Sequence, residues 1–238
     1  MLLHTLPDRT GAAAENMALD FLLLQRYPHA AVRFRHYGWR RPAFTFGYSQ
    51  KIYFVRSQLP PDGNLDLCRR PTGGGLVDHR EDWTYALVIP RGHPLEEVPA
   101  GQSYRAVHEG LAAALRRQRV SAVAKQCCEP PAEGVTAAAT GVCFQRAELY
   151  DVINEATGEK IAGAAQKRNK HGLLFQGSVW RPGAGVTMDW DLFRDDFIAE
   201  LAAALACEKE AVPWPELAED EVEGLTEQYA SPEWNESR

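Results

Sequence analysis

Apolar residues recur at the spacing of an amphipathic helix in three stretches of the chain. The first covers residues 11–27 and ends near Tyr27-Pro28, and the second covers residues 103–119. The third covers residues 193–206, and the acidic segment that follows from Trp214 is predicted to be a short helix or a frayed chain end. The pattern therefore predicts three helices, each with one apolar face.

Between these helices the chain alternates polar and apolar residues, or shows short apolar runs bounded by turn residues, as strands do. The predicted strands cover residues 31–37, 43–48, 65–70, 83–89, 120–125, 150–153, 160–166 and 173–180, with a further one at Cys143-Phe144. Because these strands do not alternate with helices in a regular βαβ order, we predict an α+β fold with a mixed β-sheet flanked by helices. With no internal repeat or linker, residues 1–238 are expected to form a single domain.

Composition narrows the class of protein further. The chain has 238 residues, of which 45% are apolar and 24% charged, as in ordinary globular proteins. A net charge of −6 argues against nucleic-acid binding, because phosphate contacts need clustered Lys and Arg. The chain start does not resemble a signal peptide, and no apolar run reaches the roughly 18 residues that span a bilayer. Five cysteines without zinc-ligand spacing predict reduced thiols in a cytoplasmic protein without a metal.

The stretch Arg69-Arg70-Pro71-Thr72-Gly73-Gly74-Gly75, followed by His79, is the first candidate for chemistry. Its glycines can adopt φ > 0, and successive N–H groups could form an electropositive hollow to which the two arginines add charge. A glycine-rich hairpin turn would explain the same residues. The spacing fits neither a P-loop nor a dinucleotide fingerprint. His79 is a buried polar group, a general base or a substrate-positioning donor, and spacing alone does not decide.

Lys160 and Cys143 are the other candidates. Lys160 leads into the small residues 161–165, so its ammonium could point into a cleft and stabilise an oxyanion or a bound carboxylate. A solvated lysine at a hairpin end is the alternative. Cys143 stands in an apolar setting, where a cysteine is more often an inert core residue than a nucleophile.

Taken together, these stretches resemble the lipoate-protein ligase and octanoyltransferase family. The resemblance rests on residues 69–75 with His79, on Lys160-Ile161-Ala162-Gly163-Ala164-Ala165-Gln166, and on Gln176-Gly177-Ser178, with support from residues 15–20 and from Trp39 with Arg41-Pro42. It covers roughly residues 11–205 and leaves an acidic tail at about 214–238. It implies the biotin/lipoyl protein ligase fold, which is related to class II synthetase cores. It also implies a substrate site formed by Arg70, Thr72, Gly73, Gly74, Gly75, His79, Gly163 and Gln166.

Two chemistries occur in the family that the chain resembles. Cys143-Phe144 stands where the cysteine-lysine octanoyltransferases hold the acyl group on a cysteine, seventeen residues before Lys160. The segment from His79 to Tyr85 also resembles those transferases, and the chain has no room for the C-terminal accessory domain of many ligases. Gly75 instead completes a triple glycine, as in ligases.

The resemblance therefore implies an acyltransferase with Cys143 and Lys160 as catalytic residues and no cofactor. An octanoyl or lipoyl group would pass from acyl carrier protein through Cys143 to a lysine of a lipoyl domain or of the glycine-cleavage H protein. We expect a monomer that binds neither nucleic acid nor a membrane. One alternative is an ATP-dependent lipoate-protein ligase, which would use ATP and Mg. The other is a non-catalytic protein that binds a lipoyl domain or an acyl group.

Overall fold

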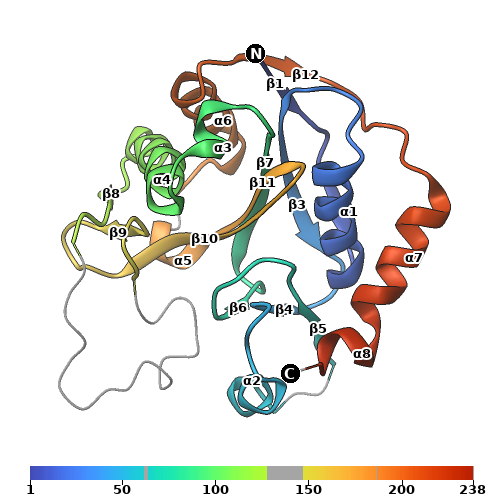
Figure 1. The fold of residues 1–238 in the computed structure, drawn as a ribbon. Helices are drawn as coiled ribbons and strands as arrows, with labels where there is room; N and C mark the ends of the chain where they lie inside the picture. The colour runs from blue at the N-terminus through green and yellow to red at the C-terminus, as the bar shows by residue number, and fades with distance from the viewer. Residues whose placement is uncertain (62–63, 128–146, 186, 238) are drawn as a thin grey trace.

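The computed structural model describes residues 1–61, 64–127, 147–185 and 187–237. Within them the chain forms a nine-stranded mixed sheet, the large sheet, in the order β12-β1-β3-β7-β11-β10-β9-β8 with β2 beside β3. A small sheet has the order β5-β4-β6 (Figure 1). The strands are β1 (Leu2–Thr5), β2 (Arg9–Gly11), β3 (Val32–Trp39), β4 (Ala43–Phe46), β5 (Asp66–Arg69), β6 (Leu76–Asp78), β7 (Asp82–Pro90), β8 (Ala122–Ala124), β9 (Val152–Asn154), β10 (Lys160–Asn169), β11 (Gly172–Trp180) and β12 (Glu208–Ala211). The helices are α1 (Ala13–Gln25), α2 (Ile52–Gln58), α3 (Pro94–Glu97), α4 (Ala100–Arg117), α5 (Arg181–Ala184), α6 (Trp190–Ala204), α7 (Glu219–Ala230) and α8 (Pro232–Asn235).

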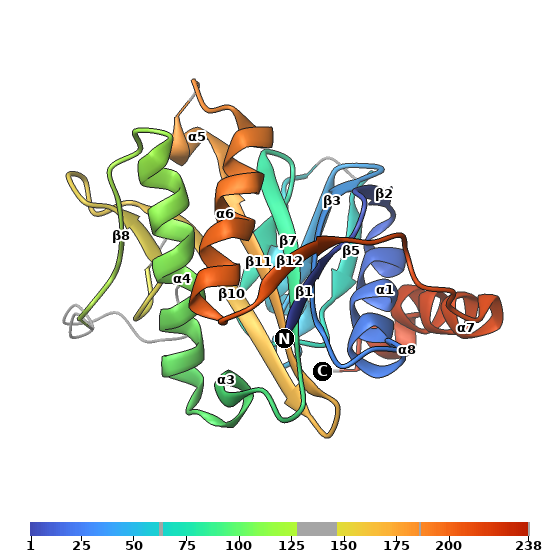
Figure 2. The ribbon, with the colours of Figure 1, turned by 90° about the horizontal axis from the view of Figure 1, so that it is seen from above.

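Helices cover both faces of the large sheet (Figure 2). On β7, Trp83, Tyr85, Leu87 and Ile89 pack against α4 and α6, whereas Ala86 and Val88 pack in a second cluster with residues of α1. The alternation follows from the two-residue period of a strand. Because both faces of β7 are covered, its sequence is a nearly continuous apolar run rather than a polar–apolar alternation.

The glycine stretch connects two strands that are not neighbours. In the small sheet β5 runs parallel to β4 and β6 runs antiparallel to it, so residues 70–75 cross the end of β4. The alternative of a hairpin turn is therefore wrong. The crossing is tight, because a Cβ on Gly47 would lie 1.9 Å from the Gly74 carbonyl oxygen. Gly74 itself has φ 86°, in the region that favours glycine.

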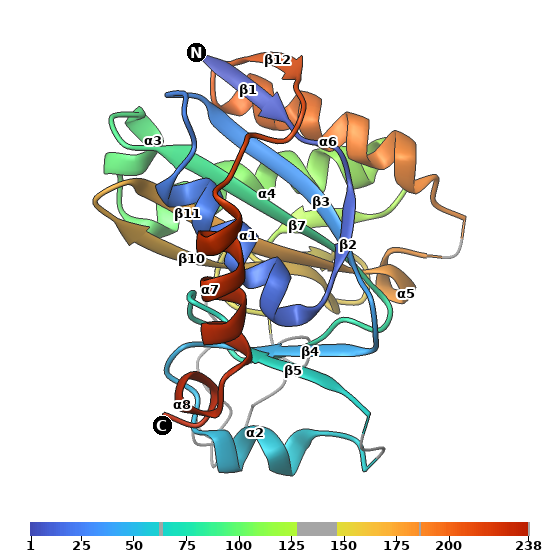
Figure 3. The same cartoon turned by 90° about the vertical axis from the view of Figure 1, so that its right-hand side faces the viewer.

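The acidic segment after Trp214 contains the helices α7 and α8. Figure 3 shows α7 lying along α1 on the outside of the large sheet. Tyr229 is buried there in a cluster with Met17 and Ala18 of α1 and with Cys68 of β5. Of the two predictions for this segment, the helix is the one that holds for residues 219–230.

Of three further predictions, two concern the described residues. None of the helices in those residues is long and apolar enough to cross a membrane. The described cysteines, which are Cys68, Cys127 and Cys207, are free thiols. The strand predicted at Cys143-Phe144 lies outside the described residues.

Candidate active site

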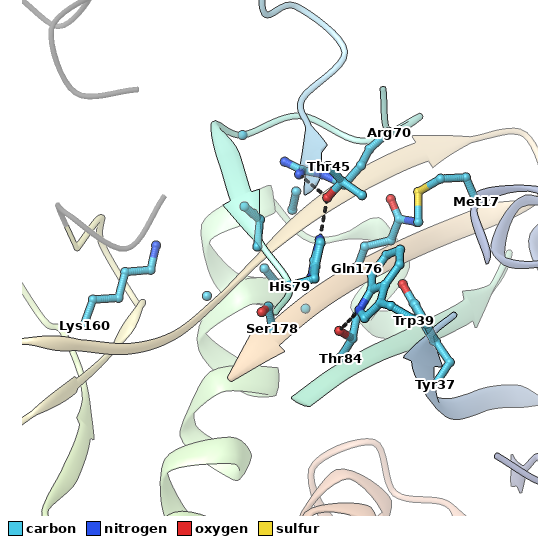
Figure 4. A pocket seen from close by; sticks show the side chains of 16 residues that line it. Met17, Tyr37, Trp39, Thr45, Arg70, His79, Thr84, Lys160, Gln176 and Ser178 are labelled. Atoms are coloured by element: carbon cyan, nitrogen blue, oxygen red, sulfur yellow. Dashed lines mark hydrogen bonds between the residues drawn. The ribbon is translucent and has the colours of Figure 1, made fainter. Parts of the chain in front are cut away.

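A cavity lies between the large and the small sheet, with about 490 Å³ of empty space when the open solvent at its mouth is included (Figure 4). α1, β3, β7, β10 and β11 form one side, and β4, β6 and the glycine stretch form the other. The lining residues are Met17, Tyr37, Trp39, Thr45, Arg70, Gly74, Val77, His79, Thr84, Lys160, Gly163, Ala164, Ala165, Gln176, Gly177 and Ser178. The two stretches that are far apart in sequence, around residues 70–79 and 160–166, thus meet in one place.

Arg70 organises the glycine stretch. Its guanidinium donates hydrogen bonds to the carbonyl oxygens of Gly73 (2.8 Å) and Gly75 (2.9 Å) and to Thr45 Oγ1 (2.8 Å). Thr72 Oγ1 donates to Gln176 Oε1 on β11 at 2.8 Å and so joins the stretch to the large sheet. A flexible glycine segment is thereby fixed from two sides. Arg69, by contrast, is not a lining residue of the cavity, and its guanidinium bonds to carbonyls near α8.

His79 lies in a buried hydrogen-bond network. Its Nδ1 lies 2.6 Å from Asp82 Oδ2 and its Nε2 2.7 Å from Thr45 Oγ1, while its ring stacks on Trp39 with centroids 4.1 Å apart. Asp82 also accepts hydrogen bonds from the hydroxyls of Thr84 (3.0 Å) and Ser178. Both ring nitrogens are occupied, which favours a positioning role over a general base. Asp82 is a site residue that the sequence analysis missed; its signal is a carboxylate three residues after the histidine, at the start of a buried strand.

The network makes Asp82 a stability determinant. In Asp82→Ala, buried donors of His79, Thr84 and Ser178 lose their acceptor, and we expect the free energy of unfolding to fall by about 3 kcal/mol. Asp78→Ala is the control, because Asp78 forms a partly exposed ion pair with Arg80 and should cost less than about 1 kcal/mol. Urea unfolding followed by circular dichroism measures both. Equal losses in the two variants would mean that the network does not stabilise the fold.

Lys160 is buried at the other end of the cavity and forms an ion pair with Asp151 (Nζ to Oδ2, 2.7 Å). Asp151 Oδ2 also accepts from the backbone N–H of Glu148 at 2.7 Å. An irregularity in the β9–β10 pairing falls between residues 160 and 162. Such a bulge re-aims side chains, and here it lets Lys160 and Gly163 face the same cavity. Asp151 is a second site residue that could not be recognised from the sequence alone. The usable signal is a carboxylate just before one strand of a hairpin, opposite a lysine that begins the other strand.

Gly163 is explained by this ion pair. A Cβ at residue 163 would lie 2.8 Å from both Lys160 Nζ and Asp151 Oδ1, so a larger side chain would push the pair apart. Gln166, in contrast, is not brought to the cavity. Its amide bonds to the Ala100 carbonyl (3.1 Å) and to Ser103 at the start of α4. Ala162 and Gln166 share the face of β10 toward α4, as the two-residue period of a strand requires.

A buried ion pair supports the end of the cavity near α1. Arg35 Nε donates to Asp20 Oδ1 at 2.7 Å, and both side chains are fully buried. Burial raises the pKa of Asp20, and the charge of Arg35 opposes that rise. Gln176 Nε2 donates to Asp20 Oδ2 at 2.7 Å and also contacts Met17 Sδ. The pair therefore fixes Gln176, which in turn holds Thr72 of the glycine stretch.

Cys143 lies outside the described residues. The described chain resumes at residue 147, and Glu148 is bonded to the same carboxylate that holds Lys160. Cys143 precedes Glu148 by five residues in the sequence.

Known proteins are similar to this chain over most of its length. Residues 12–190 match the sequence model of the lipoyl protein ligase A/B catalytic domain. Octanoyltransferase LipM of Halalkalibacterium halodurans is 31% identical over 170 residues, which are 70% of this chain and 61% of that protein. Octanoyltransferase LipM of Bacillus subtilis is 33% identical over 175 residues, which are 71% of this chain and 62% of that protein. The chain thus matches less than two thirds of the length of these relatives.

A solved structure shows the same fold. A putative lipoate protein ligase from T. acidophilum with bound lipoic acid has a TM-score of 0.75 at 17% sequence identity, and 100% of both chains is covered. The prediction of an α+β fold with a mixed sheet flanked by helices, of the lipoyl ligase type, is confirmed.

Proposed function

The chain belongs to the lipoyl protein ligase A/B catalytic-domain family, and we propose that it is an octanoyltransferase acting through a cysteine acyl-enzyme. The observation that carries the proposal is the buried Lys160 ammonium at one end of the cavity, paired with Asp151. The Asp151 carboxylate also accepts from the N–H of Glu148, which follows Cys143 by five residues in the sequence. Similarity to the octanoyltransferases of two bacteria supports the same assignment.

The reaction would proceed in two transfers. The Cys143 thiolate attacks the thioester carbonyl of the donor, and the carrier thiol leaves as the new thioester forms on the enzyme. The Lys160 ammonium stabilises the oxyanion that develops on that carbonyl, because its charge is held in place by Asp151. The amine of an acceptor lysine then attacks the enzyme thioester, releases the Cys143 thiol and forms an amide. No ATP is needed for either transfer.

The partners follow from this chemistry. We propose acyl carrier protein as the donor and a lipoyl domain or the glycine-cleavage H protein as the acceptor. We also propose that the enzyme is a monomer and that it acts in the cytoplasm. Under this proposal Arg70, His79 and Gly163 shape the acyl site, while Thr72, Gly73 and Gly75 hold the glycine stretch through their bonds to Gln176 and Arg70. Gln166 acts indirectly, by fixing β10 to α4.

The test is the intact mass of the purified protein after incubation with octanoyl-acyl carrier protein without ATP. We expect the mass to rise by one octanoyl group and the group to pass to an added lipoyl domain. The ligase would be selected if no adduct forms and the lipoyl domain is acylated only after ATP, Mg²⁺ and free octanoate are added. The triple glycine at Gly73-Gly74-Gly75 is the sequence feature that favours the ligase. Failure of both assays would leave a non-catalytic binding protein.

Met17 is expected to limit the length of the acyl chain. Lys160 and Met17 lie at opposite ends of the cavity, so a carbonyl at Lys160 directs the hydrocarbon toward Met17 (Figure 4). In Met17→Ala, room for two more methylenes should raise the ratio of decanoyl to octanoyl transfer about tenfold, at about 0.8 kcal/mol per buried CH₂. Rates with the two acyl-carrier donors measure this ratio.

Leu23→Ala is the matched control, because Leu23 is buried on the same helix but is not a lining residue of the cavity. It should leave the ratio near its wild-type value while lowering stability. An equal change in both variants would trace the effect to a loosened α1 rather than to the length of the cavity.

A further inference from the structure

The helices α7 and α8 lie beyond the residues that match the family model, and they line no part of the cavity. Both helices nevertheless pack against the rest of the protein. Tyr229 at the end of α7 is buried against α1, and its carbonyl accepts a hydrogen bond from Cys68 Sγ of β5 at 3.4 Å. The segment is therefore attached to the strand that leads directly into the glycine stretch.

α8 pairs with the outer edge of β5 through side chains. β5 is the edge strand of the small sheet, and its parallel pairing with β4 uses alternate residues, as in the bond from Arg70 N–H to the Phe46 carbonyl. The backbone of Arg69 therefore faces outward. There its N–H donates to Asn235 Oδ1 at 2.7 Å, and its carbonyl accepts from Trp234 Nε1 at 2.8 Å. Two side chains thus take the place of a neighbouring strand.

The Arg69 guanidinium continues this connection toward the cavity. It is fully buried and donates to the carbonyls of Trp234 and Asn235 on one side and of Tyr48 (2.7 Å) and Gln50 (2.8 Å) on the other.

Residues 48 and 50 bond in turn to the glycine stretch. Tyr48 N–H donates to the Thr72 carbonyl at 2.8 Å, and Gln50 Nε2 donates to the Gly74 carbonyl at 3.3 Å. A continuous series of hydrogen bonds therefore runs from α8 through Arg69 to the wall of the cavity.

We propose that Asn235 and Trp234 are positioning residues for the glycine stretch and hence for acyl-donor binding. Three successive glycines lose much backbone freedom when they are ordered, so their bound conformation needs support from outside. Arg70 supplies that support from within the cavity, and α8 supplies it through Arg69 from behind. The inference rests on the proposed function for its kinetic part, whereas its structural part is independent of any activity.

The experiment uses the full chain with Asn235→Ala and with the control Glu233→Ala, an exposed position on the same helix. Hydrogen exchange of the peptide covering residues 70–79, measured without substrate, should be faster in Asn235→Ala and unchanged in Glu233→Ala. With octanoyl-acyl carrier protein, KM should rise about tenfold in Asn235→Ala while kcat stays within about twofold, as expected when a hydrogen bond of order 1.4 kcal/mol is lost.

Asn235→Asp separates positioning from general support of α8. It keeps the oxygen that accepts from Arg69 N–H but loses the amide that donates to the carbonyls of Tyr229 and Ser231. We expect it to restore most of the slow exchange at residues 70–79 and most of the low KM. Unchanged exchange in Asn235→Ala, or exchange in Asn235→Asp as fast as in Asn235→Ala, would overturn the inference. Absence of acyl transfer in the wild type would count against the proposed function and leave the exchange result standing.

Discussion

A Cys143→Ala variant is expected to gain no octanoyl group from octanoyl-acyl carrier protein, under conditions in which the wild type gains one. The thiolate is the nucleophile of the proposed first transfer, and alanine offers no atom that can carry the acyl group. Transfer to a lipoyl domain should fall by at least about 10³-fold, because removal of a nucleophile disables the remaining catalytic groups as well. Intact mass measures the adduct, and gel-shift or mass analysis of the lipoyl domain measures the transfer.

Cys127→Ala is the matched control for this variant. Cys127 is an exposed free thiol sixteen residues before Cys143, and its loss should leave both adduct and transfer within about twofold of wild type. An adduct that survives Cys143→Ala would place the nucleophile elsewhere. Transfer that depends on ATP and is unaffected by Cys143→Ala would instead indicate the ligase.

The elements that the sequence predicted are those with many buried positions in a regular period. α4 runs from residue 100 to 117 and β7 from 82 to 90, close to their predicted bounds of 103–119 and 83–89. β12 was missed because its four residues, Glu-Lys-Glu-Ala, are all exposed, so the sequence shows no apolar face where it pairs with β1. α2 was missed for a similar reason, since Val55 is its one buried residue.

The candidate site was predicted in its chemistry but not in its supports. The glycine stretch is recognisable because three successive glycines are unusual between two strands. Lys160 is recognisable because a charged residue is unusual at the start of a strand of small residues. The supporting carboxylates are not recognisable in this way. In the sequence a buried aspartate looks like a surface one, and only its hydrogen-bond or ion-pair partner in the fold distinguishes it. These carboxylates are Asp20, Asp82 and Asp151. Those partners lie as far as 156 residues away along the chain, as Gln176 does from Asp20.

Neighbouring residues of one strand show the same limit. Arg69 and Arg70 are adjacent in sequence, and both were expected to add charge to the ligand site. Because successive side chains of a strand point to opposite sides, Arg70 faces the cavity and Arg69 faces α8. The sequence gives no indication that a helix more than 160 residues away would occupy that second side.

A Lys160→Met variant is expected to form the acyl-enzyme about 10²- to 10³-fold more slowly than wild type, the usual cost of losing one oxyanion-stabilising group. Methionine keeps the apolar stem that packs beside Gly163 but removes the ammonium that Asp151 holds 2.7 Å away. Single-turnover acylation by octanoyl-acyl carrier protein, followed by intact mass, measures the rate. Lys170→Met, at an exposed position after β10, should acylate at the wild-type rate.

Lys160→Arg tests whether charge alone is sufficient. The guanidinium is larger and planar, and the space beside Gly163 is already so tight that a single added Cβ would lie 2.8 Å from Lys160 Nζ. We therefore expect Lys160→Arg to recover less than about a tenth of the lost rate, with thermal unfolding of all three variants used to set the assay temperature. Full recovery in Lys160→Arg would mean that the positive charge acts at long range. A wild-type rate in Lys160→Met would remove the lysine from the chemistry and leave its ion pair with Asp151 as a structural feature of β10.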